Sequence, residues 1–227
     1  MKKIQSFLFL IYLLIIFQAH AQDTVILHHT WYTTIYVHHL KAPILSHYYF
    51  TAMNRAAHAA KRSAFHDDPQ LPADQQASAR DYKGDKYDKG HLSPDDDFRF
   101  SASAESDAME YTNQAPQAPK FNRITWRELE NHVRQLGKKY DTMSVYTGCI
   151  YHSPKFLSGD VAIPFEYYKI IFYEDASEAY LGLNMNQEGT YIGTKSTISL
   201  IEKLTGFKYQ KRVVKYLKEK EWNKVIW

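Results

Sequence analysis

The chain has 227 residues, of which 44% are hydrophobic and 15% aromatic, which is enough for one substantial domain with its own core. Its 28 basic and 25 acidic residues give a net charge of +3. This small excess excludes a strongly basic protein that coats nucleic acid, so any binding of phosphate must depend on local patches. Cys149 is the single cysteine, which excludes an intramolecular disulfide.

The first 21 residues predict a secretory signal peptide. Two lysines follow the initial Met, residues 7–17 are almost entirely apolar, and a small-x-small cleavage site lies at 19–21. We therefore expect a mature protein of residues 22–227, secreted or periplasmic, without a stable membrane span. Its net charge would be +1, because cleavage removes two lysines and no acidic residue. An uncleaved N-terminal anchor is the alternative, although the apolar run is short for a membrane span.

Three strands are predicted at residues 24–27, 32–40 and 45–53, where β-branched and aromatic residues dominate. The same region holds five histidines, namely His28, His29, His38, His39 and His47. No pair of them has a metal-ligand spacing with acidic or cysteine partners. We interpret them as surface or strand-face histidines and not as a metal site.

A long loop with one helical turn is predicted at residues 54–86, and the strand edge and turn that follow at 87–94 deliver His91. Gly90 precedes this histidine, and glycine allows backbone conformations that a side chain forbids. A histidine presented in this way can lie in a cleft, where its imidazole, which titrates near neutral pH, takes a proton from water. A short helix is predicted at 101–108.

The clearest predicted helix covers residues 125–136, capped by Thr125 and ended by Gly137. Its apolar stripe consists of Leu129, Val133 and Leu136.

The C-terminal half predicts further strands of a central sheet, at residues 143–150, 161–174 and 179–185. A helix at 194–205 and a basic, amphipathic terminal helix at 207–227 follow. Helices and strands are therefore mixed along one continuous domain.

Two clusters of residues carry a resemblance to a known family. The first is Asp88-Lys89-Gly90-His91-Leu92-Ser93-Pro94. The second consists of Asn113, Pro116-Gln117, Asn122, Trp126 and Leu129-Glu130. In this order they resemble the DNA/RNA non-specific endonuclease family, the ββα-metal nucleases that include endonuclease G. Weaker similarity extends over roughly residues 30–210. The resemblance implies an α+β fold whose central antiparallel sheet is flanked by helices and carries a ββα-metal nuclease motif.

The resemblance also implies roles for the site residues. His91 would be the general base that activates water. Asn122 would bind the metal, Mg²⁺ with Mn²⁺ as a possible replacement, although Asn122 is also a candidate helix cap. Glu130 would act on the metal through a water molecule. Asn113 would bind substrate, support the motif loop or hold metal-bound waters.

Two cations are candidates for contact with the substrate. Lys89 stands where the family usually has Arg, and it can contact phosphate but cannot form a bidentate fork. Arg62 resembles the family's substrate-stabilising Arg, with a solvated cation as the alternative. Asp88 is expected to pair locally, and the run at 95–97 is interpreted as a cap and surface run because it lacks the pattern of a calcium loop.

The implied activity is hydrolysis of phosphodiester bonds in DNA and RNA. The protein would bind the phosphate backbone of the nucleic acid and would not recognise its bases. One alternative is a nucleic-acid-binding protein of the same fold with weakened or lost catalysis, which only Lys89 favours. Another is a phosphodiesterase that acts on nucleotides or lipid phosphates. The sequence leaves open whether the protein forms a homodimer.

Overall fold

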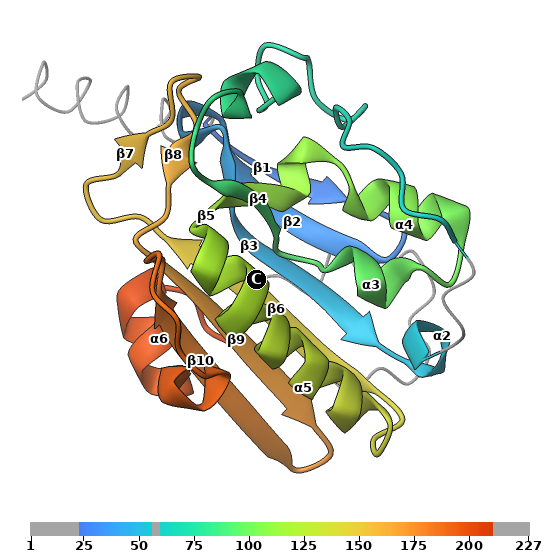
Figure 1. Cartoon of the computed structure of the whole chain (residues 1–227). Helices are drawn as coiled ribbons and strands as arrows, with labels where there is room; N and C mark the ends of the chain where they lie inside the picture. Colours follow the sequence, from blue (N-terminus) through green and yellow to red (C-terminus); the bar gives the residue numbers. More distant parts are fainter. Residues whose placement is uncertain (1–22, 56–59, 211–227) are drawn as a thin grey trace, which may run out of the picture.

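The computed structural model describes residues 23–55 and 60–210, and it shows one large sheet with helices packed against it (Figure 1). The predicted signal peptide at 1–21 and most of the predicted terminal helix, 211–227, lie outside the described residues. Within the described ranges, no helix has both the length and the apolar character needed to cross a membrane.

The large sheet has seven strands in the order β1-β2-β3-β6-β9-β10-β11, and every neighbouring pair is antiparallel. The strands are β1 (Thr24–His28), β2 (Tyr32–Val37), β3 (Ala42–Phe50), β6 (Met143–Ile150), β9 (Glu166–Tyr173), β10 (Ala176–Leu183) and β11 (Lys195–Ser196). The predicted antiparallel central sheet of an α+β fold is therefore confirmed.

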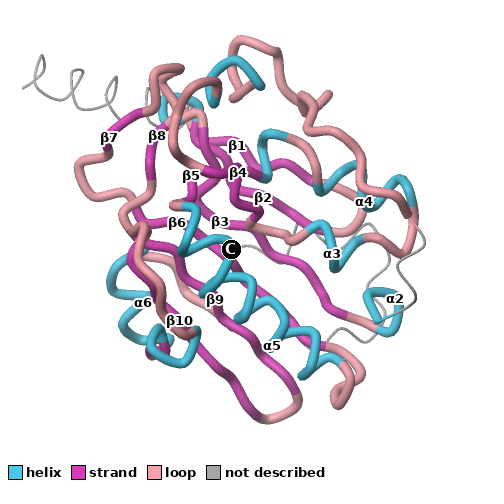
Figure 2. The backbone as a smooth tube through the Cα atoms, viewed as in Figure 1, coloured by secondary structure: helices cyan, strands magenta, loops and turns pink. Residues whose placement is uncertain are grey.

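Both faces of the sheet are covered, so that a central strand such as β6 is buried along its whole length. The helix α5 (Arg127–Gly137) packs on one face through its predicted stripe, Leu129, Val133 and Leu136. On the opposite face, Ile201 of α6 (Ile198–Thr205) packs against strand residues such as Ile170. Figure 2 shows α5 running along the sheet in front of its strands.

The helix that carries α5 begins earlier than predicted. Backbone of helical form starts at Pro119 and continues through η4, a π-helical turn (Phe121–Trp126), into α5. Proline suits a first helical turn because its missing N–H would have no partner there. Thr125 is not a cap, since its hydroxyl donates a hydrogen bond to the carbonyl of Gly189 at 2.7 Å. The predicted start at Thr125 was therefore wrong.

A separate two-stranded sheet lies beside this helix. β4 (Asp88–His91) pairs antiparallel with β5 (Gln114–Gln117), so that His91 lies opposite Gln114. The connection between the two strands holds α3 (Asp95–Phe98), α4 (Ala102–Ala108) and the 3₁₀ turn η3 (Tyr111–Asn113). Together β4, β5 and the η4–α5 helix form the ββα unit.

The remaining elements are short. They are the 3₁₀ turns η1 (His38–Leu40), η2 (Ala79–Tyr82) and η5 (Tyr191–Thr194), the helical turn α2 (Ala52–Arg55), and the strand pair β7 (Lys155–Phe156) and β8 (Ala162–Ile163). The helix predicted at 194–205 begins only at Ile198, where Thr197 accepts a hydrogen bond from the backbone N–H of Leu200 at 3.2 Å. Residues 207–210 are not helical.

Candidate active site on the ββα unit

Strand β4 sorts the motif residues onto two sides, because alternate side chains of a strand point in opposite directions. Lys89 and His91 share one side, where both meet Phe65: the two rings of Phe65 and His91 lie 5.5 Å apart, and Lys89 Nζ lies 5.0 Å from the Phe65 ring. The Lys89 ammonium is also 5.4 Å from the ring of Tyr82. The guanidinium of Arg62 lies 5.8 Å from Phe65. Three sequence-predicted residues thus converge on one phenyl ring.

Sequence reasoning missed Phe65 as a site residue. The available signal was an aromatic residue within a polar loop, three positions after Arg62. Aromatic faces attract cations, so Phe65 can hold the two basic side chains beside the imidazole.

The imidazole of His91 is neutral at ordinary pH. Its side chain is only 10% exposed, and burial, with the positive charge of Arg62, lowers the pKa of His91 to about 3. Its Nε2 lies 3.4 Å from the sulfur of Met109 and 3.8 Å from a carboxylate oxygen of Asp95. Among the described residues, no hydrogen bond engages Nδ1. A ring nitrogen is therefore free to accept a proton.

Gly90 is required for a reason other than the one predicted from the sequence. Its backbone is not in the left-handed region, where the described glycines are Gly84 and Gly206. Instead, a Cβ on Gly90 would lie 2.2 Å from the side-chain Oε1 of Gln117 on the paired strand. The glycine leaves room for the Gln117 side chain against β4, and so places His91 indirectly.

Asp88, on the other side of β4, connects the motif to the helix. Its carboxylate accepts a hydrogen bond from Asn122 Nδ2 at 2.9 Å and two from the guanidinium of Arg123 at 2.8 and 2.6 Å. Burial would raise the pKa of Asp88, but these hydrogen bonds outweigh it and lower the pKa. The expectation of local pairing was wrong, since the partners lie more than 30 residues away along the chain.

Asn122 lies inside the π-helical turn and is not a helix cap. Because Asp88 holds its amide nitrogen, the carbonyl oxygen Oδ1 is left without a donor among the described residues. A carbonyl oxygen is a ligand that Mg²⁺ accepts, so this side chain fits a metal ligand. π-helical turns are frequent at functional sites.

Glu130 lies two helical turns after Asn122, and buried charged side chains surround it. Burial raises its pKa, while the nearby cations Lys169 and Arg134 oppose the rise. Negative charge from Asp95 and Asp97 raises it further. The charge of Asp95 therefore influences Glu130, and the same carboxylate lies 3.8 Å from His91.

The run at residues 95–97 is not a surface run, which corrects the sequence interpretation. Asp97 is 1% exposed, bound to Arg134 at 3.0 Å and to the hydroxyl of Tyr48 at 2.6 Å. Asp95 lies 3.4 Å from Arg62 Nε. Only Asp96 of the three is exposed to solvent. Three consecutive acids thus have three different environments, because one helical turn points them in different directions.

Asn113 is fully buried, and its amide makes three hydrogen bonds with backbone groups. Its Oδ1 accepts from the N–H of Ser93 at 2.9 Å, and its Nδ2 donates to the carbonyls of Ser93 and Ala108, each at 2.8 Å. These bonds hold the loop that follows His91. They favour the supporting role of Asn113 among the predicted ones, and a contact with substrate remains a prediction.

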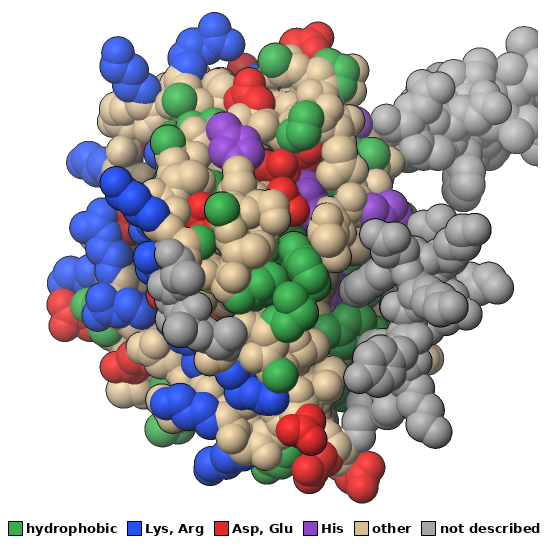
Figure 3. Space-filling model, turned by 90° about the vertical axis from the view of Figure 1, so that its right-hand side faces the viewer, with side chains coloured by type: hydrophobic (Ala, Val, Ile, Leu, Met, Phe, Trp, Pro, Cys, Tyr) green, Lys and Arg blue, Asp and Glu red, His purple; other side chains and the backbone are tan. Residues whose placement is uncertain are grey.

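Basic side chains are unevenly distributed over the surface. In Figure 3, Lys and Arg gather along the left edge of the view, the side that carries α5 and faces the reader in Figure 1. A local basic surface can attract a polyanion even when the net charge is small.

Known proteins share both the sequence pattern and the fold. A family model described as DNA/RNA non-specific endonuclease matches residues 14–215. The chain is 30% identical to "Nuclease C1" of Cunninghamella echinulata var. echinulata over 64% of this chain and 60% of that protein. It is 31% identical to "Endonuclease G, mitochondrial" of Bos taurus over 49% of this chain and 42% of that protein. It therefore spans less than two thirds of either relative.

A solved structure has a similar fold. The structure described as "Crystal structure of the EndoG/EndoGI complex: Mechanism of EndoG inhibition" superimposes with a TM-score of 0.74 at 25% identity. The match covers 81% of this chain and 84% of that chain.

Proposed function

Because the chain belongs to the DNA/RNA non-specific endonuclease family, we propose that it is a metal-dependent nuclease that hydrolyses phosphodiester bonds in DNA and RNA with little sequence preference. The observation that carries the proposal is the attachment of the motif strand to the helix. Asp88 of the motif binds Asn122 at 2.9 Å, while His91 of the same strand keeps a free ring nitrogen. A base and a candidate metal ligand are thereby held on one rigid unit.

His91 supplies the base. A neutral imidazole can take a proton from the water molecule that attacks phosphorus. Once protonated, the ring would carry a positive charge 3.8 Å from the carboxylate of Asp95, which stabilises that charge in a partly buried site. Arg62 binds the other oxygen of Asp95 at 3.4 Å, and its positive charge opposes this effect.

Asn122 would hold the metal through Oδ1, and Mg²⁺ bound there would polarise the phosphate and stabilise the leaving 3′ oxygen. Mn²⁺ would suit the same oxygen ligand. Glu130 would orient a water molecule of this site through its carboxylate form. Asp88 prevents the Asn122 amide from turning its nitrogen toward a cation.

Lys89 and Arg62 would bind the phosphate. Both cations lie near the Phe65 ring, which also contacts His91. A phosphate bound by them would therefore lie close to the imidazole of His91. Contacts with phosphate carry no sequence information, which fits cleavage without sequence preference. We propose that the enzyme acts outside the cytoplasm, after removal of the N-terminal segment.

The test is degradation of plasmid DNA and total RNA by the purified protein, with Mg²⁺ and with EDTA. We expect metal-dependent cleavage of both, lost in His91→Ala and in Asn122→Ala. His152→Ala is the matched control, because this histidine is 52% exposed and distant in sequence from the motif. Binding of DNA without cleavage by the intact protein would contradict the proposal and favour a catalytically weakened binding protein.

A further inference from the structure

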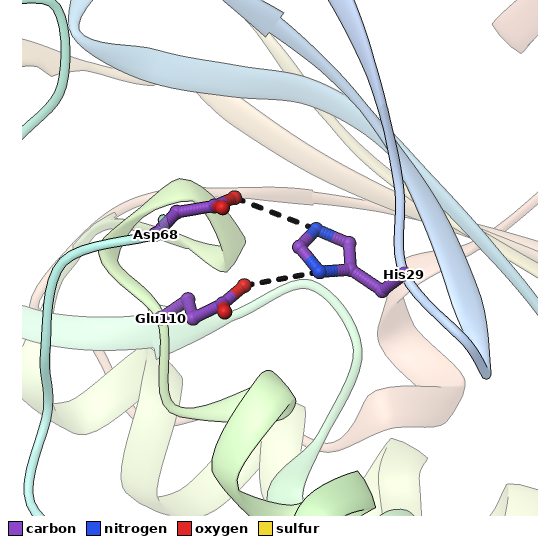
Figure 4. A group of neighbouring side chains, drawn as sticks. All are labelled: His29, Asp68 and Glu110. Atoms are coloured by element: carbon purple, nitrogen blue, oxygen red, sulfur yellow. Dashed lines mark ion pairs between the residues drawn. The ribbon is translucent and has the colours of Figure 1, made fainter. Parts of the chain in front are cut away.

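A second group of potential ligand atoms lies away from the ββα unit. His29 in the turn after β1, Asp68 in the long loop and Glu110 before η3 come together (Figure 4). His29 Nδ1 lies 3.0 Å from Glu110 Oε2, and His29 Nε2 lies 3.6 Å from Asp68 Oδ2. One ligand atom from each residue lies within 4.8 Å of the others, the one such group found in residues 23–55 and 60–210.

The three side chains are buried and incompletely satisfied. They are 3%, 0% and 5% exposed for His29, Asp68 and Glu110 respectively. His29 Nε2 has no hydrogen-bond partner, and Glu110 Oε2 has no contact of this kind beyond its ion pair with His29 Nδ1. Asp68 is better anchored, since Oδ2 accepts a hydrogen bond from the hydroxyl of Thr112 at 2.7 Å. Gln70 Nε2 lies 3.3 Å from His29 Nδ1. Buried polar atoms without partners are rare and call for an explanation.

The charge of the group is also unbalanced. Two carboxylates and one imidazole carry a net negative charge whether or not the imidazole is protonated, and Asp107 adds a further acid close by, because its charge raises the pKa of Glu110. Burial is the main cause of that raised pKa, and His29 opposes it. Buried net charge is costly unless an opposite charge is present. A divalent cation would supply it.

We propose that His29, Asp68 and Glu110 bind a divalent transition-metal ion, of which Zn²⁺ is the best match. One imidazole nitrogen and carboxylate oxygens suit Zn²⁺ better than Mg²⁺, which prefers oxygen ligands alone. A tetrahedral ion with bonds of about 2.0–2.1 Å separates neighbouring ligand atoms by roughly 3.3 Å, and the three ligand atoms, already within 4.8 Å of one another, would need to draw together to reach that spacing. His29 would bind the ion through one ring nitrogen. The carboxylate that lies at the other ring nitrogen in this structure would have to turn toward the ion.

The ion would have a structural role. Glu110 follows Met109, whose sulfur contacts His91, and the backbone of His66 bonds to both Met109 and Tyr111 at 3.3 and 2.9 Å. An ion held by three distant segments would therefore fix the loop that carries Phe65 against the segment behind His91. This inference is independent of the proposed nuclease activity, because the ion does not contact the reacting atoms.

The test uses the full chain with Asn122→Ala, which removes the proposed ligand of the ββα unit. After treatment with chelator, the protein is titrated with Zn²⁺ against a chromophoric competitor, and bound metal is counted after desalting. We expect about one tightly bound ion per chain and a Tm raised by about 5–10 °C at 100-fold excess over Kd. Adding His29→Gln should weaken binding by roughly 100-fold or more, whereas His152→Gln should not.

A second measurement covers the case in which His29→Gln does not fold. Co²⁺ added to the Asn122→Ala protein should give visible absorption bands of a low-coordinate nitrogen–oxygen site, and Zn²⁺ should displace them. Absence of a tightly bound ion, or unchanged affinity in a folded His29→Gln protein, would overturn the proposal. The group would then be a metal-free ion pair between His29 and the two carboxylates.

Discussion

At the scale of single residues, the site depends on what surrounds each ionisable group. His91 is kept neutral by burial, with its pKa lowered to about 3, while Asp88 is kept charged by three hydrogen bonds. The same strand therefore presents a proton acceptor on one side and a fixed anion on the other. Each state has a measurable consequence.

The low pKa of His91 predicts a specific pH dependence of stability. Below about pH 6.5 the unfolded chain protonates this histidine, whereas the folded chain does so only near pH 3. The free energy of unfolding should therefore fall with decreasing pH in this window, by about 1.4 kcal/mol per pH unit from this residue. In His91→Gln this contribution is absent, so urea unfolding between pH 6.5 and pH 4 should show a shallower dependence. Parallel curves for the two proteins would contradict the buried, neutral imidazole.

We expect catalysis to be lost when the charge of Lys89 is removed. Lys89→Gln should lower kcat/KM on DNA by about 100-fold, because a cation beside the phosphate is lost. Lys89→Arg should retain the activity or exceed it, since guanidinium binds phosphate through two hydrogen bonds. Lys86→Gln is the control, because Lys86 is exposed three residues earlier. Equal kcat/KM for Lys89→Gln and Lys86→Gln would show that Lys89 does not contribute to the active site.

At the scale of elements, two short pieces of backbone position the site. The packing of the Gln117 side chain of β5 against β4 depends on Gly90, and the π-helical turn η4 (Phe121–Trp126) brings Asn122 to Asp88. Neither piece is long, so both depend on contacts with the rest of the molecule. A small steric change between β4 and β5 should therefore affect folding and activity together.

Gly90→Ala tests the packing between β4 and β5. The added methyl group would meet Gln117 Oε1 at 2.2 Å, which should destabilise the protein by about 1–3 kcal/mol and lower kcat. Gly193→Ala is a matched control, because its Cβ would meet nothing closer than 3.8 Å. Its stability should change by no more than about 0.5 kcal/mol. Gln117→Gly in the Gly90→Ala background removes both the Oε1 and the Cβ that the new methyl group would meet, at 2.2 and 2.6 Å, so it should restore part of the stability measured by chemical denaturation.

At the scale of the whole molecule, buried charges join the ββα unit to the large sheet. Lys169 of β9 is fully buried, bound to Thr147 at 2.5 Å, and lies 5.4 Å from the ring of Trp126. Burial lowers its pKa, while Glu130 of α5 and Asp97 of α3 oppose that effect. Charges on a helix, a strand and a helical turn thus influence one another beneath the site.

Lys169→Met should therefore change the pH profile of activity. Burial raises the pKa of Glu130 and Lys169 lowers it, so removing the ammonium should raise this pKa further. Because the carboxylate form of Glu130 is the active one in our proposal, the acid limb of kcat should move to higher pH. Lys203→Met, an exposed change on α6, should leave the profile in place. Superimposable profiles for Lys169→Met and the intact protein would exclude this coupling.

Sequence patterns predicted the helices and strands better than they predicted the burial and the partners of individual side chains. β6 was predicted at its observed bounds because β-branched and aromatic residues continue along it. The strand predicted at 161–174 was too long, since it joined β8 to β9 across residues 164–165, where no strand forms. The helix start at Pro119 was missed because the helical pattern of apolar residues begins only at Leu129 and gives no signal for the earlier turn. The burial of Asp97 was also missed, since its partners Tyr48 and Arg134 lie 49 and 37 residues away in the chain.

By itself, the sequence determined the family resemblance, the α+β class and the residues of the motif, because these depend on residue types in a local order. Only the tertiary structure decided why Gly90 is needed, that Asp88 holds Asn122, and that Phe65 lies beside His91. It also brought His29 to Glu110, which no local spacing indicates. The physical reason is that packing and burial depend on contacts between distant segments, and these contacts form only when the sheet and helices assemble.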